Sequence, residues 1–192
     1  MNQGRLLGLT TKSFLPNYGE FYEMRQFTQG PRKARTVLYD GREVPFGPQL
    51  LFAARQMEEL VVSAEVCEDV WCPVPPSIEA AREGAVLIAN CSASDETIGK
   101  ASYRRSLIEG QSARLICGYI YANAGEGEST TDLVFGGHNV IAENGTVLEE
   151  SSRFENGVIY TEIDVRRLVS ERRKNTTCLL YTSPSPRDPK TS

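Results

Sequence analysis

Histidine is nearly absent from this sequence: His138 is the only one in 192 residues. There is also no apolar run that approaches the ~20 residues a helix needs to cross a bilayer, so we expect no membrane segment. The five cysteines are odd in number and follow no disulfide spacing, which favours a reducing, cytoplasmic location. Imidazole chemistry is therefore limited to a single position, and structural disulfides are not expected.

An excess of basic residues is lacking too, because 21 Lys and Arg stand against 25 Asp and Glu, a net charge of −4. The basic clusters at 30–35 and 165–175 are short, and such clusters are usually solvated faces. We therefore expect no nucleic-acid partner. With 40% hydrophobic and 24% charged residues, the chain has the composition of one ordinary globular domain.

Both ends of the chain are unusual. The opening "NQGR", residues 2–5, has the residues of a tight hairpin turn, yet no strand precedes it. We therefore expect a domain that is truncated at its N-terminus. The stretch "CLLYTSPSPRD", Cys178 to Asp188, resembles a translated sequencing adapter, although a natural Ser/Pro-rich disordered tail has the same composition. We expect a domain over residues 1–177 and a non-native, disordered tail over 178–192.

Short apolar segments alternate with helical ones along the chain. The pattern predicts strands at 5–10, 36–39, 49–53, 60–66, 85–90, 115–122, 132–135, 139–142, 146–149 and 158–163. It predicts helices at 54–58, at 77–83 with Ser77 as N-cap, at 99–113, and at 164–173 with Asp164 as N-cap. The strand-helix-strand order over 60–122 indicates a layered α/β fold, followed by a meander with Gly-Gly and Asn-Gly turns.

Cys67 directly follows the predicted strand 60–66, in "AEVCEDVWCPVPPS". Its sulfur should therefore lie at the carboxyl end of a strand, where open α/β sheets bind ligands. A buried, inert cysteine is the alternative. A thiol with a pKa of ~8.5 needs a base or a positive neighbour to be a nucleophile. Because His138 falls in a predicted turn, "FGGHNV", a carboxylate is the expected base, and a thiol protease is a remote alternative.

Lys12 also follows a predicted strand, in "TTKSFLPNYGEFYEMRQFTQG", residues 10–30. Aromatic residues and two glutamates come after it within this loop. A solvated lysine beside a surface aromatic patch is one interpretation. The functional interpretation is a cation that stabilises an oxyanion, held by a carboxylate and walled by aromatic side chains.

These blocks carry a resemblance. A strand-end Lys12 followed by Glu23, Phe27 and Gly30, a strand-end Cys67 followed by two acids, and a strand ending in "NCSAS" resemble the nitrilase, or carbon-nitrogen hydrolase, superfamily. Within it, "VCEDVWCPVPPS", "NCSASDETIGK" and "YIYANAGEGESTTDLVFGGHNVIAENG" resemble the glutamine-hydrolysing domains of glutamine-dependent NAD synthetases. The resemblance covers most of residues 4–172 and implies an α/β fold, the nitrilase-type four-layer α-β-β-α sandwich.

The resemblance also implies roles for individual residues. Cys67 would be the nucleophile that attacks the glutamine amide, Lys12 and the N–H of Glu68 would hold the oxyanion, and Glu23 would orient Lys12. Cys72 would only pack. The glutamine pocket would be formed by Tyr18, Phe21, Glu68, Trp71, Ser94 and Lys100. Ser94 could instead make simple loop and cap hydrogen bonds, and a lysine at 100 gives up the bidentate geometry of arginine.

The sequence departs from the family in two respects. The general-base glutamate lies upstream of the lysine in the family, and no acid of this chain matches it, so we expect the chain alone to be inactive. A synthetase half is not visible either, since "AGEGEST" lacks the lysine of a P-loop. The resemblance implies ATP and Mg²⁺ for that missing half, no cofactor or metal in this domain, and a homo-oligomeric parent. A free-standing amidase and a non-catalytic nitrilase-like partner remain alternatives.

Overall fold

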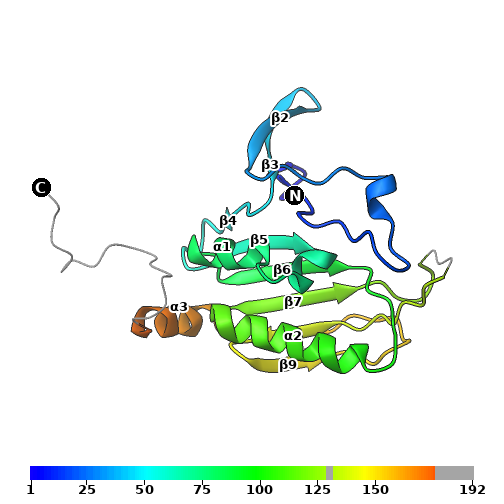
Figure 1. Cartoon of the computed structure of the whole chain (residues 1–192). Coiled ribbons are helices and arrows are strands. Elements are labelled where there is room, and N and C mark those ends of the chain that lie inside the picture. Colours follow the sequence, from blue (N-terminus) through cyan, green and yellow to red (C-terminus); the bar gives the residue numbers. More distant parts are fainter. Residues whose placement is uncertain (129–131, 176–192) are drawn as a thin grey trace, which may run out of the picture.

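A six-stranded sheet forms the centre of the computed structural model, which describes residues 1–128 and 132–175 (Figure 1). The strand order is β4-β5-β6-β7-β8-β9, with β5, β6 and β7 parallel and the other neighbours antiparallel. The strands are β4 (Phe52–Ala53), β5 (Val61–Val66), β6 (Leu87–Ser92), β7 (Gly118–Asn123), β8 (Val140–Glu143) and β9 (Thr146–Glu150). The predicted tail over 178–192, with Cys178, lies outside the described residues.

Two helices provide the crossovers between the parallel strands. Helix α1 (Pro76–Arg82) joins β5 to β6, and α2 (Lys100–Leu115) joins β6 to β7; both cover the same face of the sheet (Figure 1). The predicted strand-helix-strand order is confirmed. Ser77 is not the N-cap that we predicted, because Pro76, whose fixed φ suits the first helical position, already begins the helix. Asp164 does cap α3 (Val165–Lys174) by accepting from the Arg167 N–H at 2.9 Å.

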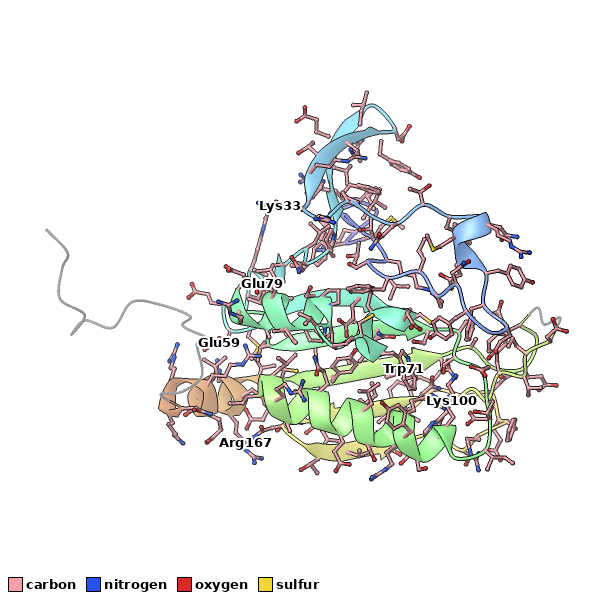
Figure 2. The ribbon with its side chains drawn as sticks, viewed as in Figure 1. Lys33, Glu59, Trp71, Glu79, Lys100 and Arg167 are labelled. Atoms are coloured by element: carbon pink, nitrogen blue, oxygen red, sulfur yellow. The ribbon has the colours of Figure 1, made fainter. Side chains whose placement is uncertain are left out.

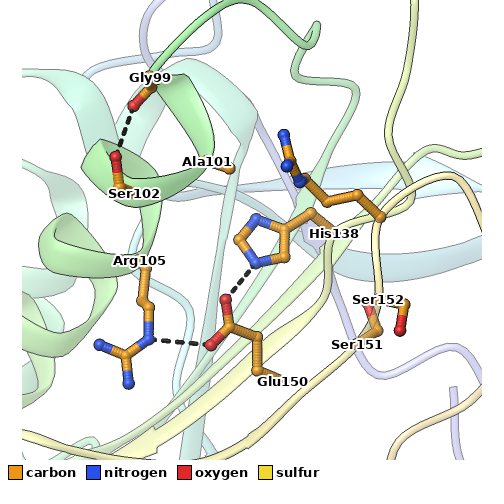
Figure 3. A pocket seen from close by; sticks show the side chains of 9 residues that line it. Gly99, Ala101, Ser102, Arg105, His138, Glu150, Ser151 and Ser152 are labelled. Carbon is orange, nitrogen blue, oxygen red and sulfur yellow. Dashed lines mark hydrogen bonds and ion pairs between the residues drawn. The ribbon is translucent and has the colours of Figure 1, made fainter.

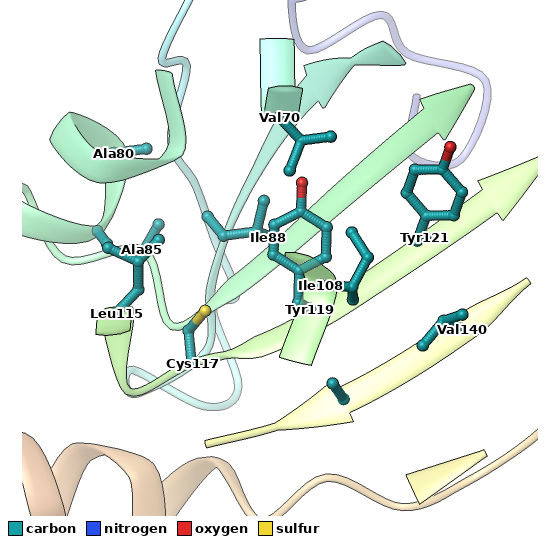
Figure 4. Close-up of a cluster of buried hydrophobic side chains, with 12 residues drawn as sticks. Val70, Ala80, Ala85, Ile88, Ile108, Leu115, Cys117, Tyr119, Tyr121 and Val140 are labelled. Atoms are coloured by element: carbon teal, nitrogen blue, oxygen red, sulfur yellow. The ribbon is translucent and has the colours of Figure 1, made fainter. Parts of the chain in front are cut away.

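The core lies between this sheet face and the two helices (Figure 4). Side chains alternate along β6, β7 and β8, so that Ile88, Tyr119 and Val140 all point to the helical face and are fully buried. Ile108 and Leu115 of α2 pack against them. A second cluster joins α3 to the start of β6, through Leu168, Val169, Val86 and Ile116. These two clusters of buried side chains hold the helices against the sheet, as the predicted α/β layering requires.

A smaller sheet stands beside the first, in the order β1-β3-β2 (Figure 1). Its strands are β1 (Leu9–Thr10), β2 (Arg35–Tyr39) and β3 (Arg42–Gly47). β3 was not predicted; it contains Pro45, which cannot donate to a ladder and pairs only with Thr36 of β2. The hairpin instead follows from Asp40 and Gly41, whose φ of 49° and 70° suit a tight turn. The predicted "NQGR" turn is confirmed by paired hydrogen bonds between Asn2 and Arg5.

Several predicted elements are wrong or shorter. Residues 54–58 are not helical, and residues 132–135 contribute only a bridge from Phe135 to Asp95. Residues 158–163 form no strand: Val158 and Tyr160 are 72% and 80% exposed, so no neighbouring strand covers them. Of the predicted strands 5–10 and 49–53, only Leu9–Thr10 and Phe52–Ala53 form strands, and β7 starts late because α2 continues to Leu115. Within the described ranges, no helix combines the length and apolar character needed to cross a membrane.

Candidate active site

The backbone leaves its extended conformation at Cys67 and forms an elbow there, directly after the end of β5. Cys67 has a φ of +49°, in the left-handed region, and it begins a short 3₁₀ helix, η2 (Cys67–Trp71). Such a conformation costs a non-glycine residue about 1–3 kcal/mol and is concentrated at functional sites. The thiol is half-buried, at the carboxyl edge of the parallel strands. The structure therefore places Cys67 on a strained elbow, open enough to meet a substrate.

Asp69 ties the loop that carries Lys12 to this elbow. Its fully buried carboxylate accepts from the backbone N–H groups of Ser13 and Phe14, both at 2.9 Å, and of Val66 at 3.0 Å. Burial raises the pKa of Asp69, although these hydrogen bonds favour the charged form. No role for Asp69 was predicted from the sequence. Its only signal was an acid placed two residues after a strand-end cysteine.

Lys12 and Glu23 form an ion pair inside that loop. The Lys12 Nζ lies 2.7 and 2.5 Å from the two carboxylate oxygens of Glu23, which begins a short 3₁₀ helix, η1 (Glu23–Arg25). Only 15% of the Lys12 side chain is exposed, so the carboxylate fixes a largely desolvated cation. Gly30 closes the loop by donating to the Lys12 carbonyl at 3.1 Å. A Cβ at position 30 would overlap the Thr11 side chain, which explains the glycine of the motif.

Aromatic and charged side chains form the rim beside the elbow. The Tyr18 hydroxyl donates to Glu68 at 2.7 Å, and its ring meets Phe21 edge-on at 5.9 Å. Partial burial and the hydrogen bond to Glu68 both raise the pKa of Tyr18. The Lys100 ammonium lies 5.9 Å from the Phe21 ring centroid and 5.6 Å from that of Trp71, its neighbour in Figure 2. A carboxylate and an ammonium thus lie on the same aromatic-walled rim.

Ser94 and Lys100 belong to the segment between β6 and α2. Lys100 is paired with the buried carboxylate of Asp95. Ser94 is itself buried, and its backbone N–H donates to the Asn123 side chain at 2.8 Å, while its Oγ accepts from Arg104 at 3.3 Å. The loop hydrogen bonds that we considered as the alternative for Ser94 are therefore present. Neither Asp95 nor Arg104 was predicted from the sequence.

Cys72, Cys117 and the histidine are poorly suited to nucleophilic chemistry at this elbow. Burial, with nearby acids, raises the pKa of Cys72 to about 11, and burial raises that of Cys117 to about 12. Cys72 also points back to the Glu68 carbonyl at 3.5 Å. The ring nitrogens of His138 contact Arg104 and Glu150, so its hydrogen-bonding capacity is already used. These contacts disfavour the cysteine-histidine pair of a thiol protease.

Comparisons with known proteins agree with this geometry. The family model of the carbon-nitrogen hydrolases matches residues 2–173. A glutamine-dependent NAD(+) synthetase of Mycobacterium tuberculosis is 48% identical over 174 residues, which cover 90% of this chain and 26% of that protein. The chain therefore spans about a quarter of the length of such curated relatives.

Solved structures give the same picture. A glutamine-dependent NAD(+) synthetase from Cytophaga hutchinsonii superposes with a TM-score of 0.66 and 33% identity, over 77% of this chain and 23% of that one. A mutant of the Nesterenkonia AN1 amidase, from the nitrilase superfamily, shares the fold at a TM-score of 0.53 and 24% identity, over 76% of this chain and 46% of that one. The resemblance and the predicted nitrilase-type α/β fold class are both confirmed.

Proposed function

Because this chain belongs to the carbon-nitrogen hydrolase family, we propose that it forms part of a longer protein that hydrolyses the side-chain amide of glutamine, with Cys67 as the nucleophile. The observation that carries the proposal is the strained backbone at Cys67. Hydrogen bonds to Asp69 connect this elbow to the loop that holds the Lys12–Glu23 ion pair. The ammonia released would serve the ATP-dependent amidation that forms NAD in a synthetase domain of a longer parent chain. ATP and Mg²⁺ would bind in that domain, and no step is assigned to them here.

The proposed reaction has two halves. The Cys67 thiol gives up its proton to a base and its sulfur bonds to the amide carbon, while Lys12 Nζ and the Glu68 N–H stabilise the oxyanion. The proton passes to the leaving nitrogen, the carbon-nitrogen bond breaks, and ammonia departs from a γ-glutamyl thioester. Water then attacks the thioester, which releases glutamate and restores the thiol. Glutamine and water are thereby converted to glutamate and ammonia.

The rim supports an amino-acid amide as the substrate. Glutamine carries an ammonium and a carboxylate at its α-carbon, and the rim offers Glu68 for the first and Lys100 for the second. Ser94 would bind the same end of the molecule, and Tyr18, Phe21 and Trp71 would exclude water. A free-standing amidase for small uncharged amides would not need this charge pair. We therefore rank that alternative second.

The general base is expected outside this chain. Among the described residues, the carboxylates nearest to Cys67 in sequence have other partners: Glu68 binds Tyr18, Asp69 binds three backbone amides, and Glu65 binds Ser77 and Tyr119. Glu23 is paired with Lys12. We therefore expect the 192-residue chain alone to release ammonia from glutamine far more slowly than the full-length gene product. A rate within about tenfold of that product would refute this.

Substitution of the nucleophile tests the proposal in the full-length gene product. Cys67→Ala should abolish NAD formation from glutamine and leave NAD formation from free ammonia unchanged. Cys91→Ala, an exposed thiol one strand away, is the matched control and should change neither. Loss of both activities in Cys67→Ala would show that Cys67 supports the fold instead.

Two further experiments on the full-length gene product test the remaining expectations. Failure of a glutamine-analogue electrophile to label Cys67 would favour the non-catalytic alternative. Size measurement of the same product would test the proposed homo-oligomer.

A further inference from the structure

Arg104 of α2 is buried in a way that stability alone does not explain. The residue is 0% exposed, and its guanidinium contacts Glu96 at 3.1 Å and the His138 ring at 2.9 Å. Yet Arg104 Nε and Glu96 Oε1 have no hydrogen-bond partner in the described structure. A buried ion pair with unfilled hydrogen bonds is a poor source of stability compared with apolar side chains of similar volume. The other hydrogen bonds of Arg104 go to Ser94 and to the carbonyl of Asp95.

The guanidinium holds three consecutive residues of the segment before α2. Arg104 Nη2 donates to the Ser94 Oγ at 3.3 Å and to the Asp95 carbonyl at 3.1 Å, while Nη1 faces Glu96. From the other side, the Asn123 amide donates to the Ser94 carbonyl at 3.1 Å. Planar, forked donors of this kind fix direction as well as distance. The path of residues 94–96 is therefore set by contacts from α2 and β7.

This segment in turn fixes the cation of the proposed glutamine pocket. Asp95 is 3% exposed, and its carboxylate binds the Lys100 ammonium, which lies 5.9 and 5.6 Å from the ring centroids of Phe21 and Trp71. A lysine ammonium is a point charge on a flexible stem, so its position depends on the partner that holds it. If residue 95 moves, the place where Lys100 can meet a substrate carboxylate moves with it.

His138, the only histidine of the sequence, contacts the Arg104 guanidinium. A guanidinium has no acceptor, so His138 Nδ1 must accept from Arg104, and the proton of a neutral ring must be on Nε2. That nitrogen lies 2.6 Å from Glu150, which also accepts from Arg105 at 2.9 Å (Figure 3). His138 is thus held in one tautomer and presents a lone pair to Arg104. Because His138 Nδ1 already accepts this hydrogen bond, His138 is not available as a base for the Cys67 thiol.

We infer that Asp95 and Arg104 are positioning residues for glutamine recognition, in which Arg104, held by His138 and Glu96, fixes Asp95 and thereby Lys100. The inference rests on the proposed glutaminase function. It concerns recognition of the substrate's α-carboxylate, and the bond-breaking steps at Cys67 are not involved. Effects on substrate recognition and effects on bond breaking can therefore be separated with two substrates that differ only in the α-carboxylate.

The test compares glutamine with 4-aminobutanamide, which is glutamine without its α-carboxylate, in the full-length gene product. Arg104→Met and Asp95→Ala should each raise the KM for glutamine about tenfold to a hundredfold, since a hydrogen-bonded charge contact is lost. The kcat/KM for 4-aminobutanamide should stay within about twofold, because that substrate never uses Lys100. Arg104→Lys should recover part of the loss. Arg114→Met, an exposed arginine of the same helix, is the matched control and should change neither value.

A double variant keeps the inference falsifiable if Arg104→Met also reduces stability. In a Lys100→Ala background, discrimination between the two substrates is already lost, so adding Arg104→Met should not reduce it further. Equal losses on both substrates, or further loss of discrimination in the double variant, would show that Arg104 acts through the fold and would overturn the inference. If the unsubstituted protein releases no ammonia from glutamine, the proposed function fails first, and this inference fails with it.

Discussion

Replacement of Asp69 by asparagine should loosen the loop that carries Lys12. One carboxylate oxygen of Asp69 accepts from Ser13 and Phe14, and the other accepts from Val66. Asparagine keeps one oxygen, so its NH₂ group must face at least one of these backbone donors. An orphaned buried amide costs about 1–3 kcal/mol, and relief of the buried charge offsets part of that cost. We expect a net loss of about 2 kcal/mol in loop docking, or a factor of about 30.

Hydrogen exchange on the 192-residue chain measures this loss directly. The amides of Phe27 and Gly30 bond to carbonyls within the same loop, so they should exchange when the loop undocks. Their protection should fall about 30-fold in Asp69→Asn, while amides in β6 change little. Asp40→Asn makes the same chemical change at an exposed turn and should have no effect on them. Equal protection in the two variants, or an equal fall throughout β6, would refute the reasoning.

Three further substitutions test packing and charge. Gly30→Ala should cost about 1–3 kcal/mol of unfolding free energy because its Cβ overlaps a neighbouring threonine, whereas Gly157→Ala meets open space and should cost little. Arg172→Met should lower the unfolding free energy measured in urea by about 3 kcal/mol, since Arg172 donates to three main-chain carbonyls, and the exposed Arg173→Met should not. Burial raises the pKa of Glu65 in the folded chain above its ordinary value of 4.5. At pH values between the pKa of the unfolded chain and that of the folded chain, only the folded chain keeps the Glu65 proton. The free energy of unfolding therefore falls as the pH rises through this range. Glu65→Gln should remove that fall in unfolding curves recorded across this range, and unchanged slopes would contradict the assignment.

Local pattern predicted a large part of this fold. Apart from the strand predicted at 132–135, the apolar runs and the turn residues predicted the order of strands and helices from Val61 to Glu150, and the Asp164 cap fixed the start of α3. These features depend on neighbours within a few residues, whose side-chain period and backbone preferences are visible in the chain. The same pattern failed at 158–163, where a β-like composition met no partner strand, and at β3, which forms a strand between β1 and β2 although it contains Pro45.

The sequence by itself determined which residue types stand at the strand ends, and so it led to Cys67 and Lys12, while the family resemblance added Glu23. Only the tertiary structure decided how they are held. Asp69 binds residues 55 and 56 positions earlier in the chain, and Arg104 contacts a histidine 34 positions later. Hydrogen bonds over such separations depend on where two elements lie in space. A side chain's chemistry shows that it needs a partner, but the fold decides which partner it finds.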